Sequence, residues 1–317
     1  TSQRVKAMTT GSVPAVIELS QTINNNALGE DNLVDILHRH ERRVLFAGDA
    51  LWAEVFPGKF AIAETGPSLS INDFTTVDAL CASFLREHAA GGDYDVLITH
   101  FLGVDHIGHY YNPDHPEMRR KLLEIDAVLD ETLRALPNGT LALVFGDHGV
   151  TEEGNHGGST PEELDAALFV YDARDRAGGP LEPATLMQVD IVPTIALAMG
   201  LQVPFSNTGT PMRDVFLGRA PTLRDVQTYV NALNVTTTQM LRFFRTNARV
   251  NHRDTDWLRP FEGQLRAIIE REIAHFDDEA ALTIDMDEHE AVLHALHATF
   301  VTTNYTIKRG LIAASAI

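Results

Sequence analysis

The stretch VLITHFLGVDHIGH, residues 96–109, runs from an apolar segment straight into acidic and histidine side chains. A second stretch with the same pattern, an apolar segment followed by acidic and histidine side chains, is LALVFGDHG at residues 141–149. Apolar runs of this length that end near a glycine are typical of buried strands in a parallel sheet. Ligands bind at the carboxyl ends of such strands, so we expect both stretches to deliver polar side chains into one crevice.

On either side of these stretches, segments typical of strands alternate with segments typical of helices. Strands are expected at residues 44–48, 96–102, 141–145 and 167–171, and helices at about 1–10, 30–40, 75–90, 116–136 and 189–200. In the helix at 116–136 the apolar residues at helical spacing are Met118, Leu122, Ile125, Val128 and Leu133. The alternation predicts an α/β fold in which helices sandwich a mainly parallel sheet.

The pattern changes after about residue 217, where strand patterns stop. Apolar residues then recur at helical spacing in three groups: Val226, Tyr229, Val230 and Leu233; Leu258, Phe261, Leu265, Ile269 and Ile273; Val292, Leu293, Leu296 and Phe300. We therefore expect one domain at residues 1–217 and a helical region at residues 218–317.

Composition excludes some classes of function. The 317 residues carry a net charge of −19, which argues against nucleic acid as a partner because a phosphate backbone needs basic side chains. The charge is compatible with attraction of a cationic headgroup, although ordinary solubility is the plainer interpretation. Cys81 is the one cysteine, so the chain forms no internal disulfide.

Three features bear on location. The sequence contains no signal peptide and no apolar run long enough to span a bilayer. Its last residues, 310–317, are apolar and follow Lys308-Arg309, which fits either the edge of a membrane helix or a frayed tail. Asn-x-Thr triplets make Asn138, Asn234 and Asn304 candidate glycosylation sites, and a turn signal predicts that Asn138 is exposed. The triplets favour a lumenal or extracellular location.

The acidic and histidine residues have the types and spacing of metal ligands. Asp105 and His109 share one side if their segment is helical, although a turn aspartate and a surface histidine remain the alternative. Asp147 and His148 directly follow a strand, and His156 comes shortly after them. Carboxylate and imidazole ligands in this number suit two divalent metals of the zinc type, the device that stabilises in-line displacement at phosphorus. His100, His106 and His115 lie nearby in sequence and are taken as supporting or surface groups.

Two further residues are candidates for the chemistry. Thr1 is the candidate nucleophile, because a hydroxyl at a helix start is near a positive dipole end that favours phosphate. The alternatives are that Thr1 only begins the sequence, or that it is an N-terminal threonine nucleophile using its own amine. Asp49 ends a predicted strand and has three interpretations: a metal ligand, a substrate contact or, most plainly, a helix cap.

Several motifs together resemble one family. They are Thr1-x-x-Arg4-x-Lys6-x-x-Thr9-Thr10-Gly11-Ser12, Gly48-Asp49-x-x-Trp52, Phe101–His109, His115-Pro116-Glu117-Met118 and Gly146-Asp147-His148-Gly149. They resemble the GPI ethanolamine phosphate transferases of the alkaline phosphatase superfamily, over about residues 1–215. The His-Pro-Glu-Met run and Asn155-His156-Gly157-Gly158 are most similar to the transferase 3 branch.

The resemblance implies a role for each candidate. Thr1 would be the phosphorylated nucleophile, Asp147 and His148 would bind one zinc, and the remaining ligands, Asp105, His109 and His156, would bind the other, with manganese as the alternative metal. The fold would be alkaline-phosphatase-like with a C-terminal helical appendage. The pattern also needs an aspartate at the end of an earlier strand, so the chain would be an N-terminally truncated part that lacks the first strand. Ala50 stands where the family has a second acidic residue.

The implied reaction moves phosphoethanolamine from phosphatidylethanolamine to a mannose of the GPI precursor, with diacylglycerol leaving. The implied location is the lumenal side of the endoplasmic reticulum, with membrane attachment through segments outside this chain and room for a small membrane partner subunit. Two alternatives stay open. One is a zinc phosphodiesterase or phosphatase whose acceptor is water, and the other is a non-catalytic lumenal scaffold.

Overall fold

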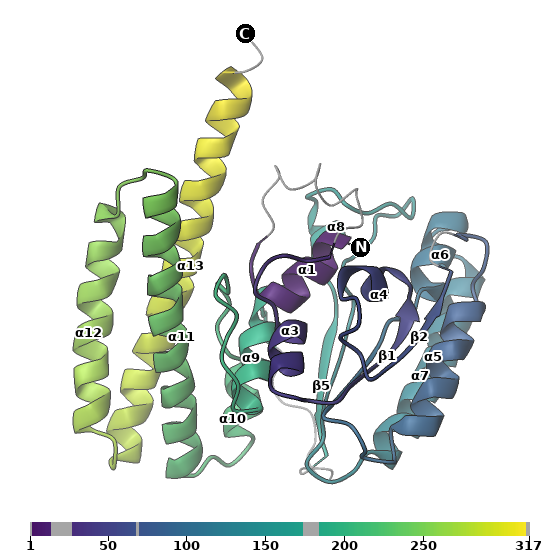
Figure 1. The fold of residues 1–317 in the computed structure, drawn as a ribbon, viewed down its shortest axis with the longest axis horizontal. Coiled ribbons are helices and arrows are strands. Elements are labelled where there is room, and N and C mark those ends of the chain that lie inside the picture. Colours follow the sequence, from purple (N-terminus) through teal and green to yellow (C-terminus); the bar gives the residue numbers. More distant parts are fainter. Residues whose placement is uncertain (1, 14–26, 68–69, 174–183, 315–317) are drawn as a thin grey trace. The chain divides into compact units, whose positions relative to one another are not determined.

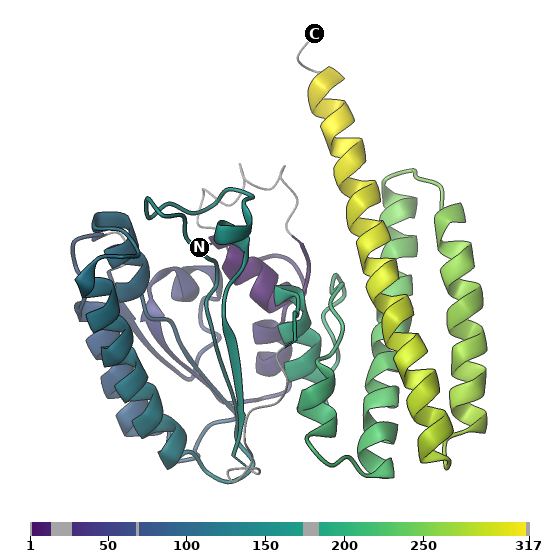
Figure 2. The same cartoon turned by 180° about the vertical axis from the view of Figure 1, so that it is seen from behind.

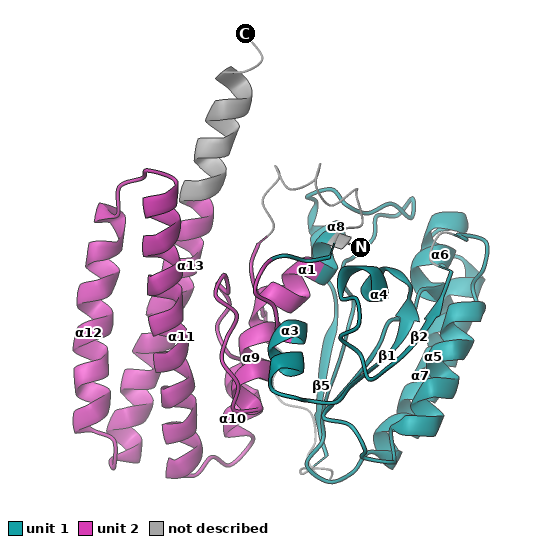
Figure 3. Cartoon of the chain, viewed as in Figure 1, with its two compact units in different colours: residues 1–5, 16–29, 34–179 teal, residues 6–15, 30–33, 180–317 magenta. Residues whose placement is uncertain are grey.

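A computed structural model describes the backbone of residues 2–13, 27–67, 70–173 and 184–314, and their side chains except those of Ser2 and residues 303–314. The chain divides into two compact units (Figure 3). Unit 1 comprises residues 1–5, 16–29 and 34–179, and unit 2 comprises residues 6–15, 30–33 and 180–317. In the described residues the strands belong to unit 1 and unit 2 is helical. The separate assignment of a catalytic domain to residues 1–217 stays a prediction.

Three strands of unit 1 form a parallel sheet in the order β2-β1-β3, as the alternating pattern predicted. Their bounds are β1 Val44–Asp49, β2 Ile62–Gly66 and β3 Val96–Thr99. In the centre of the sheet Leu45 pairs with Ile62 on one side and with Leu97 on the other. The central strand is buried along its whole length, which explains its unbroken apolar sequence. The sequence analysis did not predict β2.

The other two strands, β4 Leu141–Phe145 and β5 Leu168–Asp172, pair with each other in antiparallel fashion, with Leu143 opposite Val170. The predicted strand at 167–171 is therefore present, but it does not extend the parallel arrangement. The connection after β4 contains the four-residue helix α8 Pro161–Leu164, and the chain returns beside β4 in the opposite direction.

Helices α5 Thr76–His88 and α7 Pro116–Ala135 lie side by side in unit 1 (Figure 1), and α5 packs on β1 and β2. A core cluster joins α5 to the sheet; its buried members are Leu45, Ala47, Val77, Cys81, Phe84 and Leu102. The predicted helix at 116–136 is present as α7, in which Leu122 is 51% exposed and Lys121 is fully buried. Burial raises the pKa of the Cys81 thiol to about 12, so this cysteine is a packing residue.

The shorter helices connect these elements. Their bounds are α1 Ser2–Thr10, α3 Leu33–Arg39, α4 Leu51–Val55 and α6 Gly103–Tyr110. The helices α1 and α3 have residues in both units. As predicted, the helix near residues 30–40 buries Leu33, Ile36 and Leu37.

Unit 2 contains three long helices that lie side by side (Figures 1 and 2). They are α11 Leu223–Val250, α12 Arg259–Ala274 and α13 Glu279–Ala314, preceded by α9 Ile191–Ala198 and α10 Arg213–Leu217 and by the 3-10 turns Gln188–Asp190 and Asp256–Leu258. Most residues of the predicted apolar stripes enter one core cluster, including Tyr229, Leu265 and Leu293. Ile269 and Ile273 are not members of this cluster, and Ile273 is 72% exposed. Among the helices described, none combines the length and the apolar character needed to cross a bilayer.

Candidate metal centre

Asp105 and His109 are brought together by helix α6, which begins directly after β3. Residues four apart lie on the same face of a helix, so both side chains project from one side. The Asp105 Oδ1 atom is 3.6 Å from His109 Nε2. The conditional prediction that these side chains share a face is confirmed.

The segment after β4 brings three more predicted ligands to the same carboxylate. Asp105 Oδ1 is 3.3 Å from His156 Nε2 and 3.9 Å from His148 Nε2. His148 Nε2 is in turn 3.6 Å from Asp147 Oδ2. The five residues predicted as metal ligands therefore form one cluster, with Asp105 at its centre.

Two glycines explain why this segment docks on α6. Gly154 has a φ of 81°, and a side chain at this position would collide with the carbonyl oxygen of Gly108. The absence of side chains allows the two backbones to touch, which places His156 beside His109 with ring centroids 4.8 Å apart. Gly149 packs against the backbone of Glu162 and Asp165, where a side chain would collide with their carbonyl oxygens.

The ring nitrogens of His148 have distinct roles. Its Nδ1 atom lies 2.9 Å from the carbonyl oxygen of Gly149, which only accepts, so Nδ1 carries the proton and donates. The lone pair is then on Nε2, the atom that faces Asp105 and Asp147. Metal-binding histidines are typically oriented in this way, by a hydrogen bond from the nitrogen that does not bind the metal.

The electrostatics of the cluster favour a neutral imidazole at His156. Burial lowers the pKa of His156, and the neighbouring His148 lowers it further, while Asp105 acts in the opposite direction. A neutral imidazole has a lone pair for a metal, whereas a protonated one has none. Ligand atoms of Asp105, His109 and His156 lie within 4.8 Å of one another. One carboxylate oxygen and two imidazole nitrogens form a donor set that fits Zn²⁺.

Two residues border the cluster from β1 and β3. Asp49 is 4% exposed, and its Oδ1 atom accepts a hydrogen bond of 2.8 Å from the Leu51 N–H in the first turn of α4. This contact agrees with the interpretation of Asp49 as a helix cap. His100 accepts a hydrogen bond of 3.2 Å from the Trp52 indole at Nδ1, and burial lowers the pKa of His100, so its proton is on Nε2.

The remaining candidates are placed as follows. Thr1 lies outside the described residues. Asn138 is exposed in the turn before β4, as predicted. Asn234 lies inside α11, where its side-chain nitrogen donates to Val230 O and Glu272 Oε2, so the atom that would carry a glycan is already engaged. The side chain of Asn304 is outside the described part of α13.

A cavity of about 230 Å³ lies between α5 and α7, away from the cluster. Its lining residues are Asp78, Ala79, Ala82, Arg86, Phe101, Glu124, Ile125 and Val128. None of the five clustered residues lines it, so the cluster belongs to the carboxyl edge of the strands and not to this cavity.

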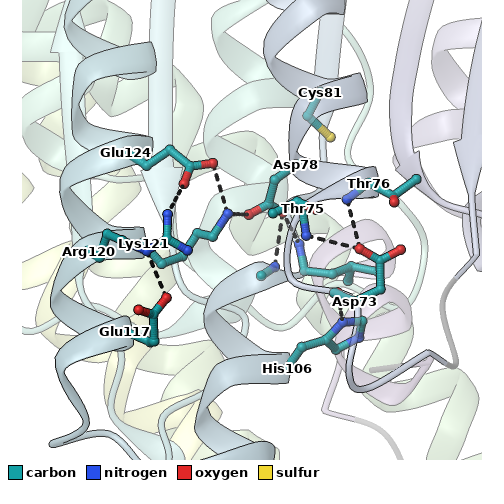
Figure 4. Close-up of polar contacts among 12 residues, drawn as sticks. Asp73, Thr75, Thr76, Asp78, Cys81, His106, Glu117, Arg120, Lys121 and Glu124 are labelled. Carbon is teal, nitrogen blue, oxygen red and sulfur yellow. Dashed lines mark hydrogen bonds and ion pairs between the residues drawn. The ribbon is translucent and has the colours of Figure 1, made fainter.

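Asp78 and Lys121 form a buried ion pair that was not predicted from the sequence. Lys121 is fully buried, and its Nζ atom is 3.1 Å from Asp78 Oδ2 (Figure 4). The signal was present in the sequence, because Lys121 is three residues after the buried Met118 and therefore on the same face of α7. A lysine on an apolar face needs a buried acidic partner.

The sequence of this chain is similar to those of known proteins. The family model described as type I phosphodiesterase / nucleotide pyrophosphatase matches residues 19–185. GPI ethanolamine phosphate transferase 3, catalytic subunit, of Mus musculus is 42% identical over 251 residues, 78% of this chain and 23% of that protein. The protein of the same name from Homo sapiens is 42% identical over 250 residues, with the same coverage. GPI ethanolamine phosphate transferase 3 of Saccharomyces cerevisiae is 32% identical over 277 residues, 82% of this chain and 26% of that protein.

The chain thus spans about a quarter of the length of these curated relatives. The predicted resemblance to GPI ethanolamine phosphate transferases is confirmed by these matches. The predicted fold class is confirmed as well, by the parallel sheet flanked by helices, the helical C-terminal region and the matched family model.

Proposed function

The chain belongs to the type I phosphodiesterase / nucleotide pyrophosphatase family, and on this basis we propose that it is the catalytic region of a GPI ethanolamine phosphate transferase. The proposed reaction moves phosphoethanolamine from phosphatidylethanolamine to a mannose of the GPI-anchor precursor. The observation that carries the proposal is the convergence of His109, His148 and His156 on the carboxylate of Asp105. Such a cluster is costly to assemble without a cation, and this argues against a purely structural scaffold.

The clustered residues are proposed to hold two divalent metals, zinc or alternatively manganese. Asp105, His109 and His156 would hold one ion, which is the grouping whose ligand atoms are mutually close. Asp147 and His148 would hold the other, supported by the orientation of the His148 Nε2 lone pair. Two such ions supply positive charge that neutralises phosphate oxygens and lowers the pKa of a bound hydroxyl. Asp49 would contribute to the substrate side of the site through its place at the end of β1.

Thr1 is the proposed nucleophile. In the first step its Oγ atom forms a bond to phosphorus, the bond from phosphorus to the diacylglycerol oxygen breaks, and that oxygen gains a proton as Thr1 loses one. In the second step the mannose hydroxyl oxygen bonds to phosphorus and loses its proton, the bond from phosphorus to Thr1 breaks, and the Thr1 oxygen regains a proton, which restores the threonine. Thr1 directly precedes α1 in the sequence, and the N-terminus of a helix favours an anionic phosphate.

A hydrolase is the second candidate, favoured by the description of the matched family as phosphodiesterases and pyrophosphatases. Both candidates share the first step, because the same residues would bind the phosphodiester and the metals. They differ in the acceptor, which is water in the hydrolase and a mannose hydroxyl in the transferase.

The proposed location is the lumenal side of the endoplasmic reticulum membrane, where a lipid donor and a glycolipid acceptor are both available. Attachment to the membrane would come from segments outside this chain, with room for a small partner subunit. Asn138 is the proposed glycosylation site, because it is the candidate acceptor that lies in an exposed turn.

The test uses the intact protein with phosphatidylethanolamine labelled in the ethanolamine group and a mannose-containing GPI precursor. We expect label on the glycolipid with the unmodified protein and none above background with Asp105→Ala. Asp130→Ala, which removes an exposed carboxylate of α7, is the matched control and should transfer normally. Release of free phosphoethanolamine without labelled glycolipid would establish the hydrolase. Equal transfer by Asp105→Ala would refute the proposed site.

A further inference from the structure

Helix α6 carries the central carboxylate of the cluster, so the way in which this helix is fixed determines where the cluster lies. The first backbone N–H groups of an α-helix have no partner within the helix and need an acceptor from elsewhere. The residue at the N-cap position of α6 is Leu102, whose side chain has no oxygen to accept them. The cap must therefore come from another element.

Asp78 of helix α5 supplies this acceptor. Its Oδ1 atom accepts hydrogen bonds from the N–H of Leu102, at 2.9 Å, and from the N–H of Gly103, at 3.0 Å (Figure 4). The carboxylate also places negative charge at the positive end of the helix dipole. Any side chain at position 103 would collide with Asp78 Oδ2, so the close approach depends on Gly103.

Lys121 of helix α7 neutralises this buried carboxylate. Asp78 is 3% exposed, and a buried charge without a counter-charge is unfavourable. The Lys121 Nζ atom is 3.1 Å from Asp78 Oδ2 and 2.9 Å from Glu124 Oε1. The Lys121 ammonium therefore contacts the buried carboxylate of Asp78 and the partly exposed carboxylate of Glu124. The Asp78–Lys121 pair links α5 and α7 at the start of α6.

A second contact fixes the middle of α6. His106 is 4% exposed, and its Nδ1 atom lies 2.8 Å from the carbonyl oxygen of Asp73, to which it donates (Figure 4). The Asp73 side chain accepts the N–H groups of Thr75 and Thr76 at the start of α5. Asp105 and His109 are also on α6, and the ligand atoms of their side chains lie close to that of His156.

We propose that Asp78 is a positioning residue for the metal centre: by capping α6 from α5, it holds Asp105 and His109 at the distance at which they bind an ion together with His156. The inference rests on the proposed metal-binding role of the cluster. Asp78 itself does not touch the metal or the substrate. The positioning depends on the Asp78 oxygen that accepts hydrogen bonds from the N–H groups of α6. Lys121 offsets the free-energy cost of burying the charge of this carboxylate.

The test compares two double variants that both remove the buried charge pair. Asp78→Asn/Lys121→Met keeps a side-chain oxygen opposite the N–H groups of α6, and Asp78→Ala/Lys121→Met removes it. The measurements are the Zn²⁺ affinity of the intact protein, by competition with a chelator, and the visible spectrum of bound Co²⁺, which reports ligand geometry. Leu293→Ala, a core truncation in unit 2, controls for a general loss of stability.

We expect the variant that retains the oxygen to bind zinc within a few-fold of the unmodified protein and to keep its Co²⁺ spectrum. The variant without the oxygen should bind roughly 10- to 100-fold more weakly, the usual cost of losing a group that orients a ligand, with an altered spectrum. Equal zinc affinities and equal spectra for the two double variants would overturn the proposal. Zinc binding by Asp105→Ala that matches the unmodified protein would instead refute the metal site itself, whatever Asp78 does.

Discussion

The imidazole rings of His148 and His156 are stacked, with centroids 3.8 Å apart and planes inclined by 21°. Burial lowers the pKa of His156, and the stacked ring of His148 lowers it further, because two rings this close cannot both carry a positive charge at low cost. Their Nε2 atoms both face the carboxylate of Asp105. The arrangement therefore has two lone pairs ready near one negative charge, which is what a divalent cation requires.

Replacement of Asp147 or His148 with Ala should abolish transfer and leave the fold intact. Each change removes a proposed metal ligand at the rim of the sheet, where the side chain does not belong to the apolar core. The loss of activity should exceed the roughly 100-fold typical of groups that only orient a ligand. Steady-state transfer and circular dichroism should be measured on the same preparations. Near-normal turnover of Asp147→Ala would show that the ligand assignment is wrong.

Thr1→Ala should stop transfer in the intact protein while bound metal persists, because the proposed metal ligands elsewhere are unchanged. Thr1→Ser should keep part of the activity, since the hydroxyl is retained and only a methyl group is lost. Rapid quenching with labelled phosphatidylethanolamine, followed by peptide mapping, should find the label on Thr1. Label on Ser2, on a histidine or on no residue during steady turnover would contradict this assignment.

The stability of unit 2 should fall as the pH rises from about 4 to about 6, because of Asp190. Burial raises the pKa of this carboxyl from 3.8 to about 6, although the N–H groups of Thr210 and Met187 and the charge of His294 act against the shift. A pKa raised in the folded state gives stability that is complete below the unfolded value and is lost above the folded one. The difference between pH 4 and pH 7 should be about 2 kcal/mol.

This dependence can be measured by urea denaturation with Trp257 as the reporter of unit 2, after Trp52 of unit 1 is replaced with Phe. Asp190→Asn in the same background should remove the slope assigned to this group. If the two proteins lose stability in parallel over this pH range, Asp190 is not its source.

Thr237→Val should destabilise unit 2 by about 1–3 kcal/mol, the cost of leaving a buried polar atom without a partner. Thr237 Oγ1 is 2.6 Å from His289 Nε2, and His289 Nδ1 is 2.7 Å from Glu272 Oε1, all inside the helical core. Thr238→Val, at the exposed neighbouring position, is the matched control and should change the free energy of unfolding little. Similar losses for the two variants would mean that the buried network is not responsible.

Local sequence patterns predicted the elements whose residues have a repeating environment. The strand at Leu141–Phe145 was predicted with its observed bounds, and the long helices of unit 2 were predicted from their apolar stripes. The segment around Asp105 was recognised because four-residue spacing places two ligands together only in a helix. These features depend on neighbours in sequence, and the sequence contains that information directly.

Features that depend on distant partners could not be predicted in this way. The pairing of β5 with β4 joins segments on either side of a long connection, and no periodicity indicates that it is antiparallel. The spacing after Met118 places Lys121 on the buried face of α7, but no local pattern identifies its partner, Asp78, which lies 43 positions earlier in the sequence. The docking of Gly154 on Gly108 likewise depends on the tertiary fold.

The antiparallel β4–β5 pair has a mechanical consequence for the centre. Asp105 and His109 follow the three-stranded sheet, whereas Asp147, His148 and His156 belong to the connection between the two strands of the other ladder. No ladder joins β3 to β4 among the described strands. An ion bound by both groups would act as a cross-link between two separately hydrogen-bonded layers. Metal binding should then slow amide hydrogen exchange in α6 and in the connection between β4 and β5 together. The two segments should open as one unit, although no strand ladder joins them among the described strands.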